Sequence, residues 1–137
     1  HANTLNTGRP ELMCHAVENA ESLKPLLKSV NTLVIGPGLG QSDWSYDLLE
    51  ACLDSTLPKV IDADALNLLA INPNHHKIWV LSPHPGEAAR LLNCTTTEVQ
   101  VDRISAIKQL QQRYGGVIIL KGAGTLIYDG KQLRLCA

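Results

Sequence analysis

The chain has 137 residues, of which 45% are hydrophobic and 18% are charged, and its formal net charge is −1. This length and composition are typical of one globular domain with a hydrophobic core, and they exclude a disordered or low-complexity chain. The near-zero charge excludes the basic footprint of a nucleic-acid or membrane-surface protein, and no apolar run reaches the roughly 18 residues that a transmembrane helix needs.

Short apolar runs that follow polar or proline-marked breaks predict buried β-strands at residues 32–35, 60–61, 78–81 and 117–120. Helical periodicity and helix-stop signals predict helices at residues 16–29, 43–53, 65–71, 85–92 and 101–114. Pro25 is expected to kink or divide the first of these helices.

Alternating strands and helices predict an α/β fold, with a mostly parallel sheet and helices on both faces. Residues 126–130 alternate between apolar and polar side chains, so they are expected to form a hairpin with the strand at 117–120.

The four cysteines, Cys14, Cys52, Cys94 and Cys136, are widely spaced and include no Cys-x-x-Cys pair. This spacing predicts free thiols of a cytoplasmic protein, with neither a disulfide framework nor a protein-held metal site. The sequence begins without methionine and ends at Ala137 within an apolar-polar alternation, so we expect it to be an excerpt of a longer protein.

Every unusual loop follows one of the predicted strands. These loops are residues 36–40, 62–64, 82–87 and 121–125. Because ligands of parallel α/β sheets bind outside the carboxyl ends of the strands, the sequence predicts one ligand site built from these loops.

Gly36-Pro37-Gly38-Leu39-Gly40 lies between a predicted strand and a predicted helix. Its amides and the following helix N-terminus can receive an anionic group, but its glycines equally suit a tight turn at positive φ. The segment also fits, loosely, a dinucleotide-binding unit in which Asp62 or Asp64 is the ribose partner.

Asp62 and Asp64 end one strand and open the next helix, so one of them, Asp64 first, is expected to be a helix N-cap. Two carboxylates at a ligand edge can alternatively orient a hydroxyl group or a magnesium-bound phosphate.

His84 lies between Pro83 and Pro85, which hold it in a rigid frame at the same edge. We therefore expect it to position or hydrogen-bond a ligand rather than to be a surface residue. Glu87, near the start of the next helix, is expected mainly to complement the helix dipole.

Lys121, Gly122, Ala123, Gly124 and Thr125 combine a point charge, close-approach glycines and a hydroxyl group between two strand-like runs. These properties suit phosphate binding, although a plain turn is the commoner use of a Lys-Gly pair. The segment is not a nucleoside-triphosphatase P-loop, because Gly-x-x-x-x-Gly-Lys-Ser/Thr is absent.

Taken together, the loops predict a nucleotide and phosphoryl-transfer site.

Five segments closely resemble the ADP/ATP-dependent NAD(P)H-hydrate dehydratases. They are residues 9–13, 34–40, 62–70, 83–92 and 121–125. The resemblance implies a ribokinase-like fold with three layers, and it implies that residues 1–137 are part of a single dehydratase domain that is truncated at both ends.

The resemblance also implies a metabolite-repair lyase that acts on the S form of hydrated NADH or NADPH. ADP or ATP phosphorylates the ring hydroxyl with magnesium assisting, and loss of phosphate restores the dihydronicotinamide. Bacterial relatives mainly use ADP and release AMP, often carry a fused epimerase domain and are commonly homo-oligomers.

Carried over to this sequence, the resemblance places a glycine of the 36–40 loop, with Gly40 as first choice, and His84 at the hydrated cofactor. Lys121 through Thr125 are expected to hold the nucleotide. Gly38, Asp64 and Asn67 are the further substrate-side candidates.

One departure from the family pattern concerns catalysis. The family's Gly-x-Gly-Asp motif, which carries the aspartate taken as catalytic base, is absent from residues 1–137. The resemblance implies that this aspartate lies beyond Ala137, so we expect this excerpt to be inactive by itself. A small-molecule kinase of the same fold and a non-catalytic nucleotide-binding module are the alternative functions.

Overall fold

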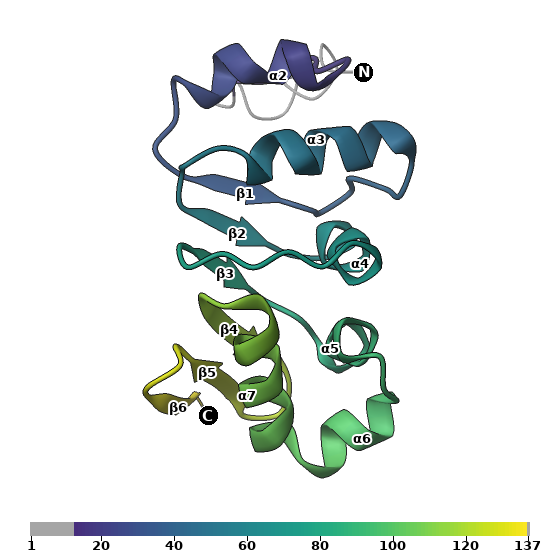
Figure 1. Cartoon of the computed structure of the whole chain (residues 1–137), viewed down its shortest axis with the longest axis vertical. Helices are drawn as coiled ribbons and strands as arrows, with labels where there is room; N and C mark the ends of the chain where they lie inside the picture. The colour runs from purple at the N-terminus through teal and green to yellow at the C-terminus, as the bar shows by residue number, and fades with distance from the viewer. Residues whose placement is uncertain (1–12, 137) are drawn as a thin grey trace.

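The computed structural model describes residues 13–136, so Ala137 and most of the predicted 9–13 segment lie outside the described residues. Six strands form one sheet in the order β1-β2-β3-β4-β5-β6 (Figure 1). The first four are parallel and the last three form an antiparallel meander. Their bounds are Leu33–Ile35, Lys59–Ile61, Trp79–Leu81, Val117–Leu120, Thr125–Tyr128 and Leu133–Cys136. The predicted α/β class with a mostly parallel sheet is confirmed, and so is the β4–β5 hairpin.

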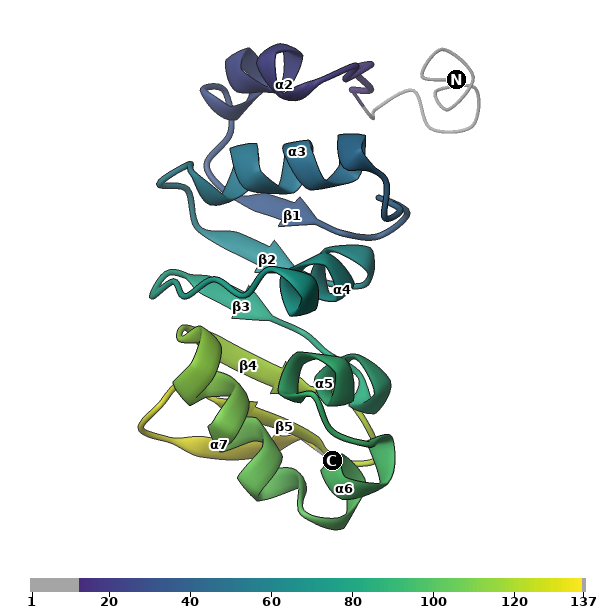
Figure 2. The same cartoon turned by 45° about the vertical axis from the view of Figure 1, so that its right-hand side comes forward.

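Three predicted helices are found within one residue of their expected bounds. They are α3 (Asp43–Leu53), α4 (Asp64–Ile71) and α5 (Pro85–Leu92). Each connects two adjacent parallel strands or begins such a connection, and Figures 1 and 2 show them with α7 (Arg103–Tyr114) along one side of the sheet.

The first predicted helix is shorter than expected. The helix α2 spans only Ala20–Leu27, because the Asn19 side chain accepts the Ser22 amide and sets the start one turn later than predicted. Pro25 lies inside α2, so it does not divide the helix. The helix packs on α3 rather than directly on the sheet (Figure 2).

The predicted helix at 101–114 was wrong at its start. The structure has a separate helix α6 (Thr96–Val101), and α7 begins only at Arg103. Thr95 and Glu98 form a capping box for α6, whereas Asp102 leaves helical geometry and its side chain accepts the Ser105 amide. Two closely spaced N-caps, Thr95 and Asp102, each followed by apolar residues, give a pattern that resembles one helix and its preceding loop.

The core lies between the sheet and its helices. Parallel register puts the fully buried side chains of Ile61, Leu81 and Ile118 on one face, where Leu66 and Ile107 belong to the same apolar cluster. Alternate strand positions face the other way and are less covered by the described residues; Val34 is 70% exposed there. No helix in residues 13–136 is long and apolar enough to span a bilayer.

Two side-chain hydrogen bonds tie the end of α7 to the rest of the core. The indole of Trp79 donates to the Tyr114 carbonyl oxygen at 3.1 Å, and the Tyr114 hydroxyl donates to the Leu91 carbonyl oxygen at 2.9 Å. Both side chains are essentially buried, so these bonds satisfy polar groups that would otherwise cost stability. They fix α7 against β3 and α5, and α7 leads directly into β4.

The ends of β1 and β2 approach each other too closely for a side chain. A Cβ on Gly36 would lie 1.6 Å from the Asp62 carbonyl oxygen, and Gly36 has φ of +131°. The Asp62 amide also donates to the Ile35 carbonyl oxygen at 3.1 Å. Glycine at position 36 therefore lets two of the predicted ligand loops meet.

Gly36→Ala is expected to lower the free energy of unfolding by about 3 kcal/mol or more, because both the backbone and the φ value must change. Gly38→Ala is the matched control. Its Cβ would enter open space, so only the φ penalty of about 1–2 kcal/mol remains. Urea unfolding of the full-length protein measures both. An equal decrease in the free energy of unfolding for the two variants would contradict the explanation that Gly36 is needed for the close approach to Asp62.

Candidate functional site

The four predicted loops lie at one edge of the sheet. Each follows the carboxyl end of one of the parallel strands β1 to β4, which are neighbours in that order (Figure 1). The expectation that these loops lie at the same edge of the sheet is confirmed by this topology.

The 36–40 loop is tied to the start of α4. The Gly40 amide donates to the Asp64 Oδ2 atom at 2.8 Å. Gly36, Gly38 and Gly40 all have positive φ, so turn geometry alone accounts for the glycines. Because the Asp64 carboxylate already occupies this amide, the loop is better suited to a neutral polar part of a ligand than to a phosphate.

The expectation that an aspartate caps α4 was wrong. Ala63 occupies the N-cap position, and no side chain caps the helix there. Ala63 has φ of +48°, an uncommon value for a residue with a Cβ, and its amide donates to Asp62 Oδ1 at 2.9 Å. This backbone conformation leaves Asp64 directed at Gly40 and Asp62 directed at Lys121, so the two carboxylates have separate partners.

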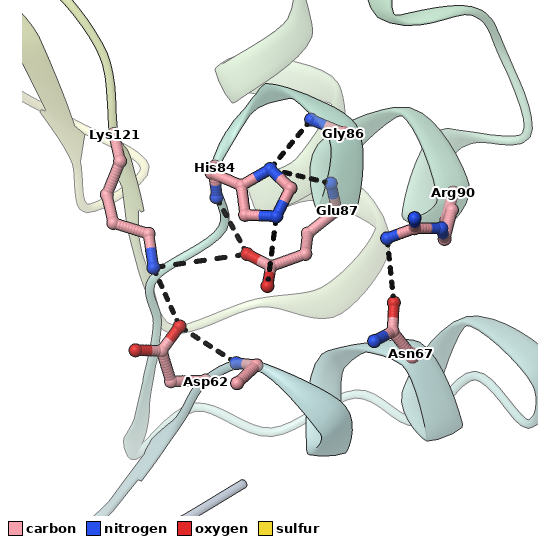
Figure 3. A network of polar contacts seen from close by, with 8 residues as sticks. Asp62, Asn67, His84, Gly86, Glu87, Arg90 and Lys121 are labelled. Atoms are coloured by element: carbon pink, nitrogen blue, oxygen red, sulfur yellow. Dashed lines mark hydrogen bonds and ion pairs between the residues drawn. The ribbon is translucent and has the colours of Figure 1, made fainter. Parts of the chain in front are cut away.

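His84 is the N-cap of α5 (Figure 3). Its Nδ1 atom accepts the amides of Gly86 and Glu87 at 3.0 and 3.4 Å, while the Glu87 carboxylate accepts the His84 amide at 2.8 Å. An Nδ1 atom that faces two N–H donors cannot itself carry a proton. The ring proton therefore lies on Nε2, which is 3.3 Å from Glu87 Oε1. In this arrangement Nε2, and not Nδ1, is the ring atom that can donate a hydrogen bond.

Glu87 has a larger part than the sequence predicted. Its side chain is 7% exposed, and its oxygens contact both the backbone and the ring of His84. Oε2 also lies 3.9 Å from the Lys121 ammonium nitrogen (Figure 3). Besides its place in the first turn of α5, Glu87 thus joins the histidine loop to the lysine loop.

Lys121 crosses from the end of β4 to the end of β2. Its Nζ atom is 2.8 Å from Asp62 Oδ1 (Figure 3). Partial burial by itself raises the pKa of Asp62, but hydrogen bonds from Lys121 and the Ala63 amide, with the lysine charge, outweigh it and hold that pKa below its usual value. A carboxylate in this setting is ionised at neutral pH and is a weak proton acceptor.

Asn67 is placed apart from this cluster. Its side-chain oxygen accepts a hydrogen bond from Arg90 of α5 at 3.0 Å, and Figure 3 shows the pair beside the His84–Lys121 group rather than within it. Within residues 13–136, no group of three or more His, Cys, Asp or Glu side chains converges into a metal site. The described cysteines are free thiols, as their spacing predicts.

The aspartate expected as catalytic base falls outside the site described so far. Its predicted place is beyond Ala137, and Ala137 itself lies outside the residues that the structure describes. The position of the base, and the inactivity of this excerpt without it, therefore stay predictions.

Arg103 contacts the end of β4 and the following loop from the start of α7 and was not among the predicted residues: its guanidinium donates to the carbonyl oxygens of Ala123 and Leu120. No sequence signal indicates this contact, because the arginine is 17 to 20 residues from its acceptors and belongs to another element.

Comparisons with known proteins point to one family. The family model described as NAD(P)H-hydrate dehydratase matches residues 1–137. The bifunctional NAD(P)H-hydrate repair enzyme Nnr of Coxiella burnetii is 55% identical over 132 residues, which are 96% of this chain and 27% of the relative. The chain therefore spans about a quarter of that relative's length.

Two solved structures are similar in fold. The ADP/ATP-dependent NAD(P)H-hydrate dehydratase from Bacillus subtilis, co-crystallised with ATP and Mg²⁺, has a TM-score of 0.67 and 29% identity over 77% of this chain and 39% of its own. A ribokinase-like superfamily protein of Enterococcus faecalis has a TM-score of 0.82 over 96% of this chain and 47% of its own; at 23% identity it supports the fold alone. Because the family model matches residues 1–137 and the Coxiella burnetii relative is 55% identical over 96% of the chain, the chain belongs to the NAD(P)H-hydrate dehydratase family.

Proposed function

We propose that this chain is part of a single dehydratase domain that converts (S)-NADH hydrate or (S)-NADPH hydrate back to NADH or NADPH. In the full-length protein, ADP or ATP transfers a phosphoryl group to the hydroxyl of the hydrated ring. The phosphate then leaves, a ring proton is lost and the double bond returns. With ADP, the products are the reduced cofactor, AMP and inorganic phosphate.

The observation that carries this proposal is the chain of contacts from His84 through Glu87 to Lys121 and Asp62. It joins the residue expected at the hydrated cofactor to the residue expected at the nucleotide. A phosphoryl transfer needs its two substrates within reach of each other, and this chain of contacts puts their candidate loops side by side.

His84 and Lys121, two members of this chain of contacts, have different roles in the proposal. His84 donates its Nε2 hydrogen to a polar oxygen of the hydrated cofactor, which orients the ring. Gly40, Gly38, Asp64 and Asn67 remain candidates for the rest of that ligand. Lys121 contributes positive charge to the phosphates, and the Gly122–Gly124 amides and the Thr125 hydroxyl contribute hydrogen bonds.

Asp62 is not proposed as the general base, because its ion pair with Lys121 and its lowered pKa make it a weak proton acceptor. The base is proposed instead to be the family's aspartate beyond Ala137. Magnesium is proposed to come with the nucleotide and to be held mainly by phosphate oxygens, since Asp62 and Asp64 are turned to different partners. Bound there, it would neutralise phosphate charge.

The wider setting is proposed from the resemblance and from the bifunctional relative. The full-length protein is proposed to be cytoplasmic, to form homo-oligomers and to carry a fused epimerase domain. Turnover of hydrated NADPH with ADP, followed at the absorbance band of the reduced nicotinamide, tests the proposed activity. A kinase of the same fold would instead accumulate a phosphorylated product without restoring that band.

His84→Asn separates the structural role of His84 from the proposed functional one. Asparagine is a good N-cap residue, so the free energy of unfolding is expected to change by less than about 1 kcal/mol. The Nε2 donor is lost, so kcat/KM for the hydrated cofactor is expected to fall by roughly 5-fold to 150-fold, the equivalent of 1–3 kcal/mol. Wild-type kcat/KM in a stable His84→Asn protein would remove His84 from the substrate site.

Lys121→Ala is expected to weaken ADP binding by about tenfold, because it removes the positively charged side chain of the 121–125 loop. Lys108→Ala is the matched control, since Lys108 is an exposed lysine of α7 outside the site. Isothermal calorimetry with ADP on the full-length proteins measures both. Equal ADP affinity in the two variants would contradict the assignment of the loop to the nucleotide.

A further inference from the structure

Arg103 underlies the 121–125 loop from a different element. It is the first residue of α7, and its Nη1 atom donates to the Ala123 carbonyl oxygen at 2.8 Å. Its Nη2 atom donates to the Leu120 carbonyl oxygen at 3.1 Å and lies 3.5 Å from that of Lys121. One guanidinium therefore holds carbonyl groups on both sides of Gly122.

These contacts decide which way the peptide groups of the loop point. In a trans peptide the C=O of one residue and the N–H of the next point in opposite directions. Carbonyls of Lys121 and Ala123 that turn toward Arg103 therefore turn the amides of Gly122 and Gly124 away from it. In residues 13–136, no hydrogen-bond acceptor is found for the amides of residues 122–124.

The loop sequence is adapted to the guanidinium. A Cβ on Gly122 would lie 2.9 Å from Arg103 Nη2 and 3.2 Å from its Cζ, and Gly122 has φ of +153°. A side chain at position 122 would thus require the guanidinium to shift. The glycine serves the contact beneath the loop as well as any ligand above it.

Part of the Arg103 guanidinium has no partner within the described residues. The Arg103 Nε atom is buried and has no hydrogen-bond partner within the described residues, and an unpaired buried donor is destabilising. No carboxylate among residues 13–136 forms an ion pair with this guanidinium. Its positive charge therefore remains available to attract phosphate from beneath the loop.

We propose that Arg103 is a positioning residue for the nucleotide: it holds the carbonyl groups of the 121–125 loop inward, so that the amides of Gly122 and Gly124 face the phosphates of ADP or ATP. This inference rests on the proposed function of the loop. It adds that nucleotide affinity depends on a residue that does not touch the nucleotide.

Arg103→Lys tests the proposal in the full-length protein. The charge is kept, but a single ammonium cannot reproduce the planar, two-pronged contact with separate carbonyl groups. The expected result is a rise of about tenfold in the KM and Kd for ADP. The kcat at saturating ADP and the KM for hydrated NADPH are expected to stay within about twofold of wild type, because chemistry and cofactor binding are untouched. Arg113→Lys, at an exposed position of the same helix, is the matched control.

Hydrogen exchange gives a second measurement. In ligand-free protein, the amides of residues 122–124 are expected to exchange faster in Arg103→Lys than in Arg113→Lys. Saturating ADP is expected to protect them in the control more than in Arg103→Lys at equal ADP concentration.

Each outcome decides the proposal. Equal ADP affinity for Arg103→Lys and Arg113→Lys overturns it. A parallel loss of kcat, both KM values and melting temperature in Arg103→Lys shows a merely structural role and also overturns it. If wild type binds ADP but does not dehydrate the hydrated cofactor, the proposed function fails, and the affinity comparison still decides the role of Arg103. If wild type binds neither ADP nor ATP, both fail.

Discussion

The parallel pairing of β1 to β4 is the constraint on which the site depends. Parallel strands that follow one another in the sheet bring all their carboxyl ends to the same edge, so loops separated by many residues become neighbours. The buried faces of β2, β3 and β4 fix this register, because a one-residue slip would turn Ile61 or Leu81 out of the core. Core packing thus positions the loops at the carboxyl edge, although the loop residues lie outside the core.

Charge holds the loops together once the sheet has brought them close. Lys121 is paired with Asp62 and lies near Glu87, and Glu87 in turn holds the backbone and ring of His84. Glu87 is buried, and Asp62 and Lys121 are partly shielded from water, so the contacts among these three are screened less than those of fully exposed ion pairs. Any anion that approached Lys121 would compete with Asp62 for its ammonium group.

Much of the fold could be predicted because its signals are local. The strands are apolar runs, and α3, α4 and α5 have clear periodicity and stops, so their bounds differ by at most one residue from those expected. The failures were also local in origin. The Asn19 N-cap makes α2 begin later than the apolar pattern predicts. Asp102 interrupts an apolar pattern that otherwise predicts one continuous helix. Both N-capping residues and apolar periodicity influence where a helix begins, and periodicity alone does not show which of them sets the first residue.

The sequence by itself determined the fold class, the four edge loops and the residue types that suit a nucleotide site, since strand hydrophobicity and glycine placement are properties of short segments. Only the tertiary structure decided the partners of those residues. Lys121 meets Asp62 across 59 positions, Asp64 binds Gly40 instead of capping its helix, and Arg103 reaches the loop after β4 from α7. Such contacts depend on how strands and helices are arranged in space, and that arrangement is fixed by the packing of the whole core rather than by the residues in contact.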